Sequence, residues 1–354
     1  MEFNYKIKQK KEDFIVDEIS LQPDFYHCKK SNFSYLWIEK RGMTTFDAID
    51  EIKKIFNLNY EDVSAQGLKD EDGITSQLIS IRKIIFQNDL KLFNKKYTSD
   101  DFKLQIKNIA GYGIRPLIPR LLHGNNFKLI IRNLNKVTAK LFYNYCRDNR
   151  FISFINYYDN QRFGIAGGPY NTHLIGELIV NKDWVRAFKE FEKSKNNEIN
   201  RIEKSEKLSS SLCKNYFKKI NFSKLSFFVS SYNSYLWNKN ASDYLVDEKI
   251  KTHKYNFPEV GPLALPKESI FKLPNIFIVD AYDINKNTYR VLQKPQTRNL
   301  IVTTTIFPLN IEKDELNKNK YCIQVSFFLP TGCYATMLIK QIFIKLNDNI
   351  CLEK

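Results

Sequence analysis

Short strand-like runs, with a few amphipathic helical segments between them, are the feature that most limits how this chain can fold. Residues 33–40 alternate apolar and polar side chains until Arg41-Gly42 interrupts the pattern. Such alternation is typical of a strand with one buried face. Residues 127–134 and 321–329 are two further strand-like runs. This mixture of short elements favours an α+β fold over a doubly wound parallel sheet.

The run at 321–329 has two distinct faces. Because side chains alternate along a strand, one face carries Ile323, Val325, Phe327 and Leu329. A turn is expected directly after it, and residues 334–345 then predict a closing helix. The inward face of that helix should carry Ala335, Leu338, Ile339 and Ile342.

A second amphipathic helix is expected at residues 45–57. Thr44 is suited to the N-cap position, and Asp47 three residues later gives a loose capping box. The apolar residues that recur at helical spacing are Phe46, Ile49, Ile52 and Phe56. We therefore expect this helix to pack on a sheet.

Length and charge limit the class of protein. With 354 residues the chain is long enough for two domains. It contains no run near the roughly 20 apolar residues needed to span a bilayer, and its N-terminus lacks the apolar centre of a signal peptide. We therefore expect a cytoplasmic protein without a membrane partner.

A formal net charge of +16 favours a polyanionic partner such as nucleic acid. Abundant Asn and Ile leave open that part of this excess reflects a lysine-rich proteome. Residues 181–224 contain 12 Lys or Arg against 6 Asp or Glu. Apolar residues are sparse there, which predicts a helical, well-solvated segment whose positive face either touches RNA or only faces solvent.

Cofactor and metal sites have little support. The sequence has no GxGxxG, P-loop or HExxH motif. Its six cysteines include no CxxC pair, and His27-Cys28 has no second pair to complete a zinc site. We expect no metal, no cofactor, and reduced, mostly buried thiols.

The segment 67–77, GLKDEDGITSQ, carries the best catalytic candidate. It has the form GxKDxxxxTxQ and resembles the GxKDxxAxTxQ segment that holds the catalytic aspartate in the TruD family of tRNA pseudouridine synthases. The shared residues are Gly67, Lys69, Asp70, Thr75 and Gln77. The chain departs from that pattern at Gly73, where alanine is usual.

Other segments resemble TruD motifs in the same order along the chain. They are Lys8 before Asp13-Phe14-Ile15-Val16 (DFxV), Gly124-Asn125-Asn126-Phe127 (GNxF) followed by Arg132, residues 156–164 (NYFxxQRFG), residues 234–238 (SxLFN) and residues 327–336 (FxLPxGSYAT). The matches extend over nearly the whole chain. Lys340 stands where the family more often has arginine, which puts in doubt any bidentate contact at that position.

The resemblance implies a mixed-sheet pseudouridine synthase core interrupted by a TruD-specific α/β insertion domain. Residues 1–150 and 297–354 would form the catalytic domain, and residues 151–296 the insertion. The implied activity is isomerisation of a D-arm uridine of tRNA, of the uridine-13 type, to pseudouridine. The implied partner is tRNA and no cofactor is needed. No protein partner is implied, and we expect a monomer.

The resemblance also assigns roles. Asp70 would be the catalytic carboxylate, acting either as nucleophile or as base. The implied substrate-binding residues are Lys8, Phe14, Asn125, Phe127 and Phe327. Lys8 would pair with Asp70, the three rings would stack under the flipped uracil, and the Asn125 amide would bind the uracil edge or orient Asp70. Gln161 and Arg162 would contact RNA or brace a domain junction.

Two other classes of protein are weighed against the enzyme. A non-catalytic RNA-binding or RNA-folding protein could keep the scaffold, but it would tolerate loss of Asp70, which is present with its flanking Lys, Thr and Gln. A structural or membrane-surface basic protein would not explain why separate motifs occur in one order. The sequence therefore favours the enzyme.

Overall fold

The computed structural model divides into two compact units. Unit 1 comprises Met1–Ile152 and Thr304–Ala335, and unit 2 comprises Ser153–Thr303 and Thr336–Lys354. The structure describes residues 4–21, 31–96, 103–164, 169–193, 208–220, 222–248, 250–257, 260–267 and 273–352. His27 and Cys28 lie outside these ranges. The closing helix is grouped with unit 2, whereas the predicted division into a catalytic domain and an insertion stays a prediction.

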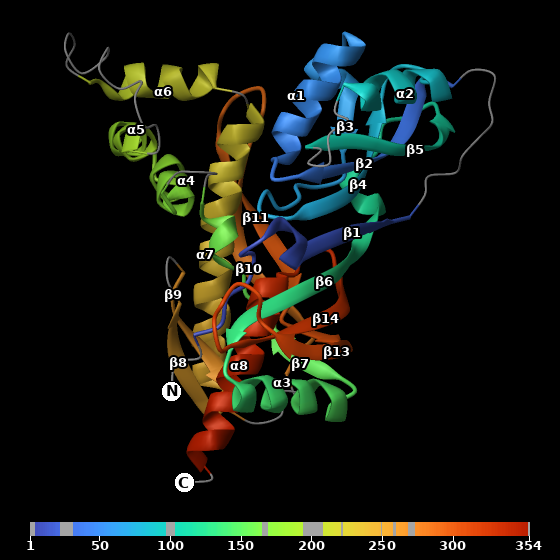
Figure 1. The fold of residues 1–354 in the computed structure, drawn as a ribbon. Coiled ribbons are helices and arrows are strands. Elements are labelled where there is room, and N and C mark those ends of the chain that lie inside the picture. The colour runs from blue at the N-terminus through green and yellow to red at the C-terminus, as the bar shows by residue number, and fades with distance from the viewer. Residues whose placement is uncertain are drawn as a thin grey trace. The chain divides into compact units, whose positions relative to one another are not determined.

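A mixed sheet of eight described strands forms the centre of unit 1 (Figure 1). The strands are β1 (Phe14–Ser20), β2 (Phe33–Arg41), β3 (Val63–Ala65), β4 (Ile74–Ile81), β5 (Leu104–Gly113), β6 (Leu122–Leu134), β13 (Ile306–Lys313) and β14 (Tyr321–Pro330). Their order is β13-β14-β6-β1-β4-β2-β5, and β3 pairs with β4. The pair β1–β4 is parallel, and the other neighbouring pairs are antiparallel. The expected α+β class with a mixed sheet is confirmed.

The strands predicted from alternation are β2, β6 and β14, and all three are confirmed, although β6 begins five residues earlier than expected. The predicted apolar face of β14 is buried, from Ile323 to Leu329. Because β6 and β14 are neighbours in the sheet, Phe127 and Phe327, which are 200 positions apart in the chain, lie opposite each other.

Helices α1 (Thr45–Phe56), α2 (Gln87–Lys95) and α3 (Lys136–Asp148) belong to unit 1. The N-cap prediction for α1 is confirmed, since Thr44 accepts the Asp47 N–H at 3.1 Å and forms a capping box with it. The predicted face is wrong at Phe46, which is 45% exposed. Ile49, Ile52 and Phe56 are buried as predicted, and Thr45 and Ala48 complete the buried face at the start of the helix.

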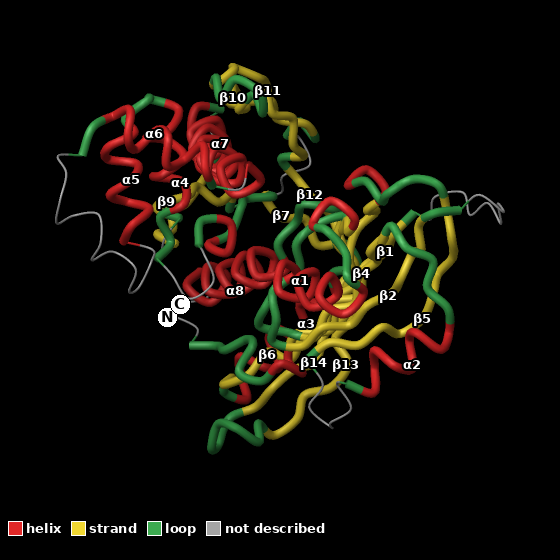
Figure 2. Tube along the Cα trace, turned by 90° about the horizontal axis from the view of Figure 1, so that it is seen from above, coloured by secondary structure: helices red, strands yellow, loops and turns green. Residues whose placement is uncertain are grey.

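Unit 2 is built around the long helix α7, with small two-stranded sheets beside it (Figures 1 and 2). Its helices are α4 (Thr172–Val180), α5 (Trp184–Lys193), α6 (Ser210–Lys219), α7 (Phe222–Asp247) and α8 (Ala335–Leu352). Its strands are β7 (Ile152–Ile155), β8 (Thr252–Phe257), β9 (Gly261–Pro266), β10 (Ile276–Ile284), β11 (Val291–Asn299) and β12 (Ile301–Thr304). The pairs are β10–β11, β12–β7 and β8–β9.

Helix α8 confirms the closing helix predicted after residue 334. Its expected inward residues, Ala335, Leu338, Ile339 and Ile342, are all buried. Within the described part of the chain, none of the helices combines the length and apolar character that crossing a bilayer requires. Among the cysteines, Cys146, Cys213 and Cys322 are buried free thiols and Cys333 is half-buried.

The basic segment 181–224 is helical where the structure describes it, but it is less solvated than predicted. Helices α5 and α6 bury one face each in the core of unit 2. The buried residues are Trp184, Ala187, Phe188, Phe191, Cys213 and Phe217. Few apolar residues are enough here because they recur at helical spacing, so that each helix still has one continuous apolar stripe. Residues 194–207 lie outside the described ranges.

Candidate active site

Asp70 lies in the connection between β3 and β4 and forms an ion pair with Lys8. The distance from Lys8 Nζ to Asp70 Oδ1 is 3.0 Å. The side chains are 12% and 21% exposed, so the pair is largely screened from water but accessible. The structure therefore brings together the two charged residues that the sequence singled out, although 62 positions separate them.

The neighbouring Lys69 has a different partner. Its Nζ lies 2.7 Å from Glu18 Oε2, and both side chains are almost fully buried. Glu18 also accepts the main-chain N–H of Leu78 at 3.2 Å. Lys69 is therefore bound to β1 rather than paired with Asp70, in agreement with the expectation that a more distant cation is the partner of the aspartate.

The main chain of this segment is held by Thr45 and Gln77. The N–H of Lys69 donates to Thr45 Oγ1 at 3.0 Å, and that hydroxyl donates to Gln77 Oε1 at 3.1 Å. Both polar side chains are buried. Gln77 thus helps to hold the segment that carries Asp70 indirectly, through Thr45, the first residue of α1.

Gly73 is where the chain departs from the usual TruD pattern, and its surroundings explain the departure. A Cβ atom at this position would come within 2.3 Å of the main-chain oxygen of Phe14. Real Cβ atoms do not approach a main-chain atom so closely, so β1 would have to move. Glycine here allows the aspartate segment to pass directly beside the strand that carries Phe14.

Lys40, which the sequence analysis did not select, lies fully buried beneath the same segment. Its ammonium donates to three main-chain carbonyl oxygens: that of Met43 at 2.7 Å, that of Lys69 at 3.4 Å and that of Asp70 at 2.5 Å. Burial lowers its pKa to about 8, against a raising effect of the nearby Asp70 carboxylate. The signal that was available is its register, since Lys40 follows Leu36 and Ile38 on the buried face of β2.

The three predicted phenylalanines form one cluster on adjacent strands. Phe127 on β6 lies opposite Phe327 on β14, and their rings stack at 5.4 Å. The Phe14 ring on β1 meets the Phe127 ring edge-on at 6.0 Å. Lys8 Nζ lies 4.2 Å above the centre of Phe14, which joins the cluster to the ion pair. The rings are only 1–5% exposed, so a base that stacks on them has to displace the side chains that cover them.

Asn125 lies on the same face of β6 as Phe127, two residues before it. Its main chain is opposite Glu18 on one side and Leu329 on the other. Its Oδ1 is buried and has no hydrogen-bond partner among the described residues. A buried amide oxygen without a partner is unusual, and it is available to a donor such as an N–H of a bound base.

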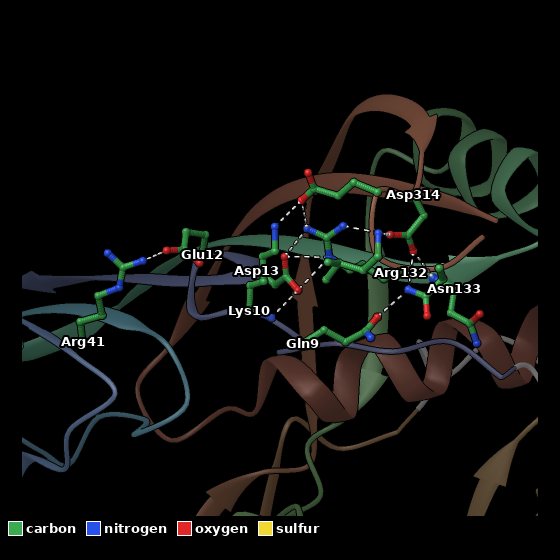
Figure 3. Close-up of polar contacts among 11 residues, drawn as sticks. Gln9, Lys10, Glu12, Asp13, Arg41, Arg132, Asn133 and Asp314 are labelled. Atoms are coloured by element: carbon green, nitrogen blue, oxygen red, sulfur yellow. Dashed lines mark hydrogen bonds and ion pairs between the residues drawn. The ribbon is translucent and has the colours of Figure 1, made fainter. Parts of the chain in front are cut away.

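The segment that carries Lys8 is anchored on both sides by Arg132 of β6. Main-chain hydrogen bonds of 3.0 and 2.8 Å join Lys6 to Arg132, and the Arg132 guanidinium binds the Asp13 carboxylate at 2.7–2.9 Å. Figure 3 shows this guanidinium between the carboxylates of Asp13 and Asp314, and hydrogen bonding to Asp13 raises its pKa. Lys8 between these anchors has φ +61°, a conformation that costs energy for a residue other than glycine.

The remaining motif residues lie in unit 2 and bind one another. The Asn238 amide spans the main chain of Tyr158 with bonds of 2.8 and 2.9 Å. Arg162 donates to Ser234 Oγ at 2.9 Å and also to Ser230. Within unit 2 the guanidinium of Arg162 therefore joins the motif at 156–164 to helix α7, and its predicted role at RNA or at a domain junction stays a prediction.

Lys340 also belongs to this network. Its Nζ binds Asp159 Oδ1 at 2.6 Å, and the fully buried Asp159 accepts the Thr336 hydroxyl and the N–H of Asn160 as well. The lysine thus makes a single ion pair, for which the bidentate geometry of arginine is not needed. Glu71 and Asp72, which directly follow Asp70 in the chain, are exposed. Among the described residues no three His, Cys, Asp or Glu side chains gather in a way that could hold a metal ion.

Comparison with known proteins decides the family. The family model for tRNA pseudouridine synthase D (TruD) matches residues 2–211, more than half of the chain. This chain belongs to the TruD family. It is 24% identical to a Methanococcus maripaludis protein assigned as tRNA pseudouridine synthase D 1, over 96% of this chain and 99% of that protein. It is 25% identical to tRNA pseudouridine synthase D of Leptospira interrogans, over 96% of each chain.

The fold comparison agrees with the TruD assignment. A crystal structure of a Methanosarcina mazei protein assigned to tRNA pseudouridine synthase D superposes with a TM-score of 0.56. That match covers 95% of this chain and 92% of the other at 17% identity. At this identity the similarity establishes the TruD fold, which includes both units.

Proposed function

We propose that this TruD protein is an isomerase that converts a D-arm uridine of tRNA, of the uridine-13 type, to pseudouridine, with Asp70 as the catalytic carboxylate. The observation that carries the proposal is the Lys8–Asp70 ion pair beside the three phenylalanine rings. We also propose that the catalytic domain is formed by residues 1–150 and 297–354 and the insertion by residues 151–296. All six proposed site residues lie within unit 1.

The isomerisation needs a carboxylate beside the sugar of the target uridine, and Asp70 can supply it. The N1–C1′ bond of uridine breaks, the uracil turns, C5 bonds to C1′, and the proton lost from C5 is balanced by one gained at N1. Two roles are open to the Asp70 carboxylate: attack on C1′, or removal of a proton from the sugar. Both need an oriented carboxylate, and the 3.0 Å ion pair with Lys8 holds the Asp70 side chain in place.

The substrate contacts follow from the same arrangement. The target base must leave its stack, at a cost of a few kcal/mol. Stacking on aromatic rings returns about 1–3 kcal/mol per base, and we propose Phe14, Phe127 and Phe327 for this role. The unpartnered Oδ1 of Asn125 supports a contact with an N–H of the uracil edge. The net charge of +16 supports binding of the tRNA backbone.

The test is pseudouridine mapping of tRNA from cells that lack this gene, with rescue by the wild type or by Asp70→Ala. Loss of one D-arm site that only the wild type restores is the expected result. The purified variant should keep its tRNA affinity, because phosphate contacts supply most of the binding. Normal product formation by Asp70→Ala would overturn the catalytic assignment.

An unchanged map would favour the alternative, a TruD scaffold that binds RNA without catalysis. The cytoplasmic location and the monomeric state stay predictions. Fractionation and sedimentation of the native protein would test them.

A further inference from the structure

Lys40 is a charged side chain in the interior of unit 1, and its position in the sequence does not explain what stabilises it there. A charged group in a protein core is costly unless hydrogen bonds satisfy it. Lys40 on β2 is 0% exposed, and its three bonds to the carbonyl oxygens of Met43, Lys69 and Asp70 match the three N–H donors of an ammonium group. Two of these three acceptors are the peptide groups on either side of the Asp70 α-carbon.

From this geometry we infer that Lys40, in its charged form, is a positioning residue that holds the main chain at Asp70 so that the carboxylate meets Lys8 and the reacting sugar. The inference rests on the proposed function. Lys40 donates to the carbonyl oxygens of the segment, while the Thr45 hydroxyl accepts the N–H of Lys69. The main chain is thus fixed through both its carbonyl oxygens and its N–H, and the side chain of Asp70 pairs with Lys8.

The protonation state of Lys40 matters because an amine has one N–H donor fewer than an ammonium. When the proton is lost, one of the three carbonyl oxygens loses its donor. The charged groups whose fields act on Lys40 are Asp70, Glu71 and Asp47, which favour the charged form, and Lys69, which disfavours it. Burial outweighs them and brings the pKa to about 8. The residues opposite Lys40 on the neighbouring strands, Thr75 and Leu104, do not titrate.

Activity and stability should therefore respond to pH in opposite directions. The isomerisation rate should fall as pH rises through about 8, because the segment loosens. The folded-state pKa of Lys40 is below its unfolded value of 10.5, so between these values the unfolded chain binds more protons. The contribution of Lys40 to folding stability then rises with pH. If Lys40 only stabilised the fold, the isomerisation rate would not fall over the pH range in which the contribution of Lys40 to folding stability rises.

The experiment uses the full-length protein and tRNA substrate under single-turnover conditions. It compares the wild type with Lys40→Met and with the control Lys345→Met. Lys345 is a matched control because it is also largely buried with a lowered pKa and donates to a main-chain oxygen, that of Ser153 at 3.1 Å in unit 2. Lys40→Met should lower the isomerisation rate constant by about 100-fold, the size expected from misplacing a reacting group. Its tRNA affinity should stay within about threefold, because phosphate contacts dominate binding, and Lys345→Met should keep the wild-type rate.

The wild-type pH profile is the second measurement, and it does not depend on how well the variant folds. The rate constant should decline with an apparent pKa near 8, at constant tRNA affinity. A wild-type rate that stays flat from about pH 7 to pH 9.5, or a folded Lys40→Met with a rate close to that of the wild type, overturns the inference. An inactive wild type would instead overturn the proposed function, and the inference with it.

Discussion

Each unit brings together residues from motifs that are far apart in sequence. The polar groups of these residues are partly accessible in unit 1 and form a buried hydrogen-bonded network in unit 2. In unit 1, Lys8 and Asp70 form a partly accessible pair, and the Asn125 side-chain oxygen has no partner among the described residues. In unit 2, Asp159 is fully buried and accepts bonds from three groups, and Arg162 donates to two serines. A specific motif can therefore mark architecture as well as chemistry, and the accessibility of the carboxylate distinguishes the two, since Asp70 is 21% exposed and Asp159 is fully buried.

The largest effect that tests this comparison is expected at Lys8. Lys8→Met removes the cation that pairs with the Asp70 carboxylate, and the isomerisation rate should fall by about 10³-fold, the size seen when one electrostatic group of an active site is lost. The free energy of unfolding should fall by about 1–2 kcal/mol, because the pair is largely screened from water and lies between the exposed and the fully buried case. Single-turnover assays and urea unfolding measure the two quantities.

Lys10→Met is the control for this experiment. Lys10 lies on the same segment and also forms an ion pair, with Glu315 at 2.7 Å, but both side chains are exposed. Its loss should leave the rate near that of the wild type. Equal losses in the two variants would mean that the N-terminal segment acts by its overall charge or order, and not through Lys8.

The opposite pattern is expected in unit 2, at Asp159. Asp159→Ala removes the acceptor of Lys340 and of the Thr336 hydroxyl, and leaves these donors unsatisfied. The free energy of unfolding should fall by about 2–3 kcal/mol. The isomerisation rate per folded molecule should not change. A large rate loss at unchanged stability would place Asp159 in the chemistry and remove the distinction between the units.

The sequence predicts the parts of this structure that local patterns encode. Alternation locates β2 and β14, and the Thr44 capping box locates the start of α1. The face of α1 is less well encoded, because both Thr45 and Phe46 could face the sheet, and the hydrogen bonds of Thr45 to the aspartate segment decide between them.

The candidate site is predictable only in part. Family motifs nominate Lys8 and Asp70, and the structure brings them within 3.0 Å. The same motifs do not reveal Lys40, because its acceptors are main-chain oxygens, of which two lie about 30 residues further along the chain. Every residue has a main-chain carbonyl oxygen, so an acceptor of this kind cannot be recognised from the residue type. Interactions of this kind become visible only when the backbone path is known.

A smaller effect is expected at Gly73, where the aspartate segment passes β1. Gly73→Ala introduces a Cβ atom 2.3 Å from the Phe14 oxygen, so strand and segment must separate. Overpacking of this kind costs about 1–3 kcal/mol of folding stability, and we expect the lower part of that range together with a reduced rate. Gly67→Ala is the matched control within the same motif, because its Cβ would meet Leu122 at an ordinary 3.5 Å. Equal stability of the two variants would contradict the close approach.

The smallest effect at neutral pH, and the one that sharpens the contrast between the two interiors, is expected at His173. Lys40 carries its charge in the core of unit 1 because three carbonyl oxygens accept from it. His173 in unit 2 packs against the rings of Phe163 and Tyr235, and its Nδ1 has no hydrogen-bond partner among the described residues. Burial lowers the pKa of His173 to about 4.

The folded protein therefore keeps His173 neutral where the unfolded chain, with an ordinary value of 6.5, takes up a proton. Between these two values the unfolded state binds more protons, so stability falls as pH falls. We expect a loss of about 0.7 kcal/mol from this residue on going from pH 7 to pH 6. Urea unfolding at both pH values should show this loss in the wild type and not in His173→Phe, which cannot be protonated. An equal loss in both proteins would mean that the interior of unit 2 accommodates the imidazolium, and that the two units do not differ in how they treat a buried charge.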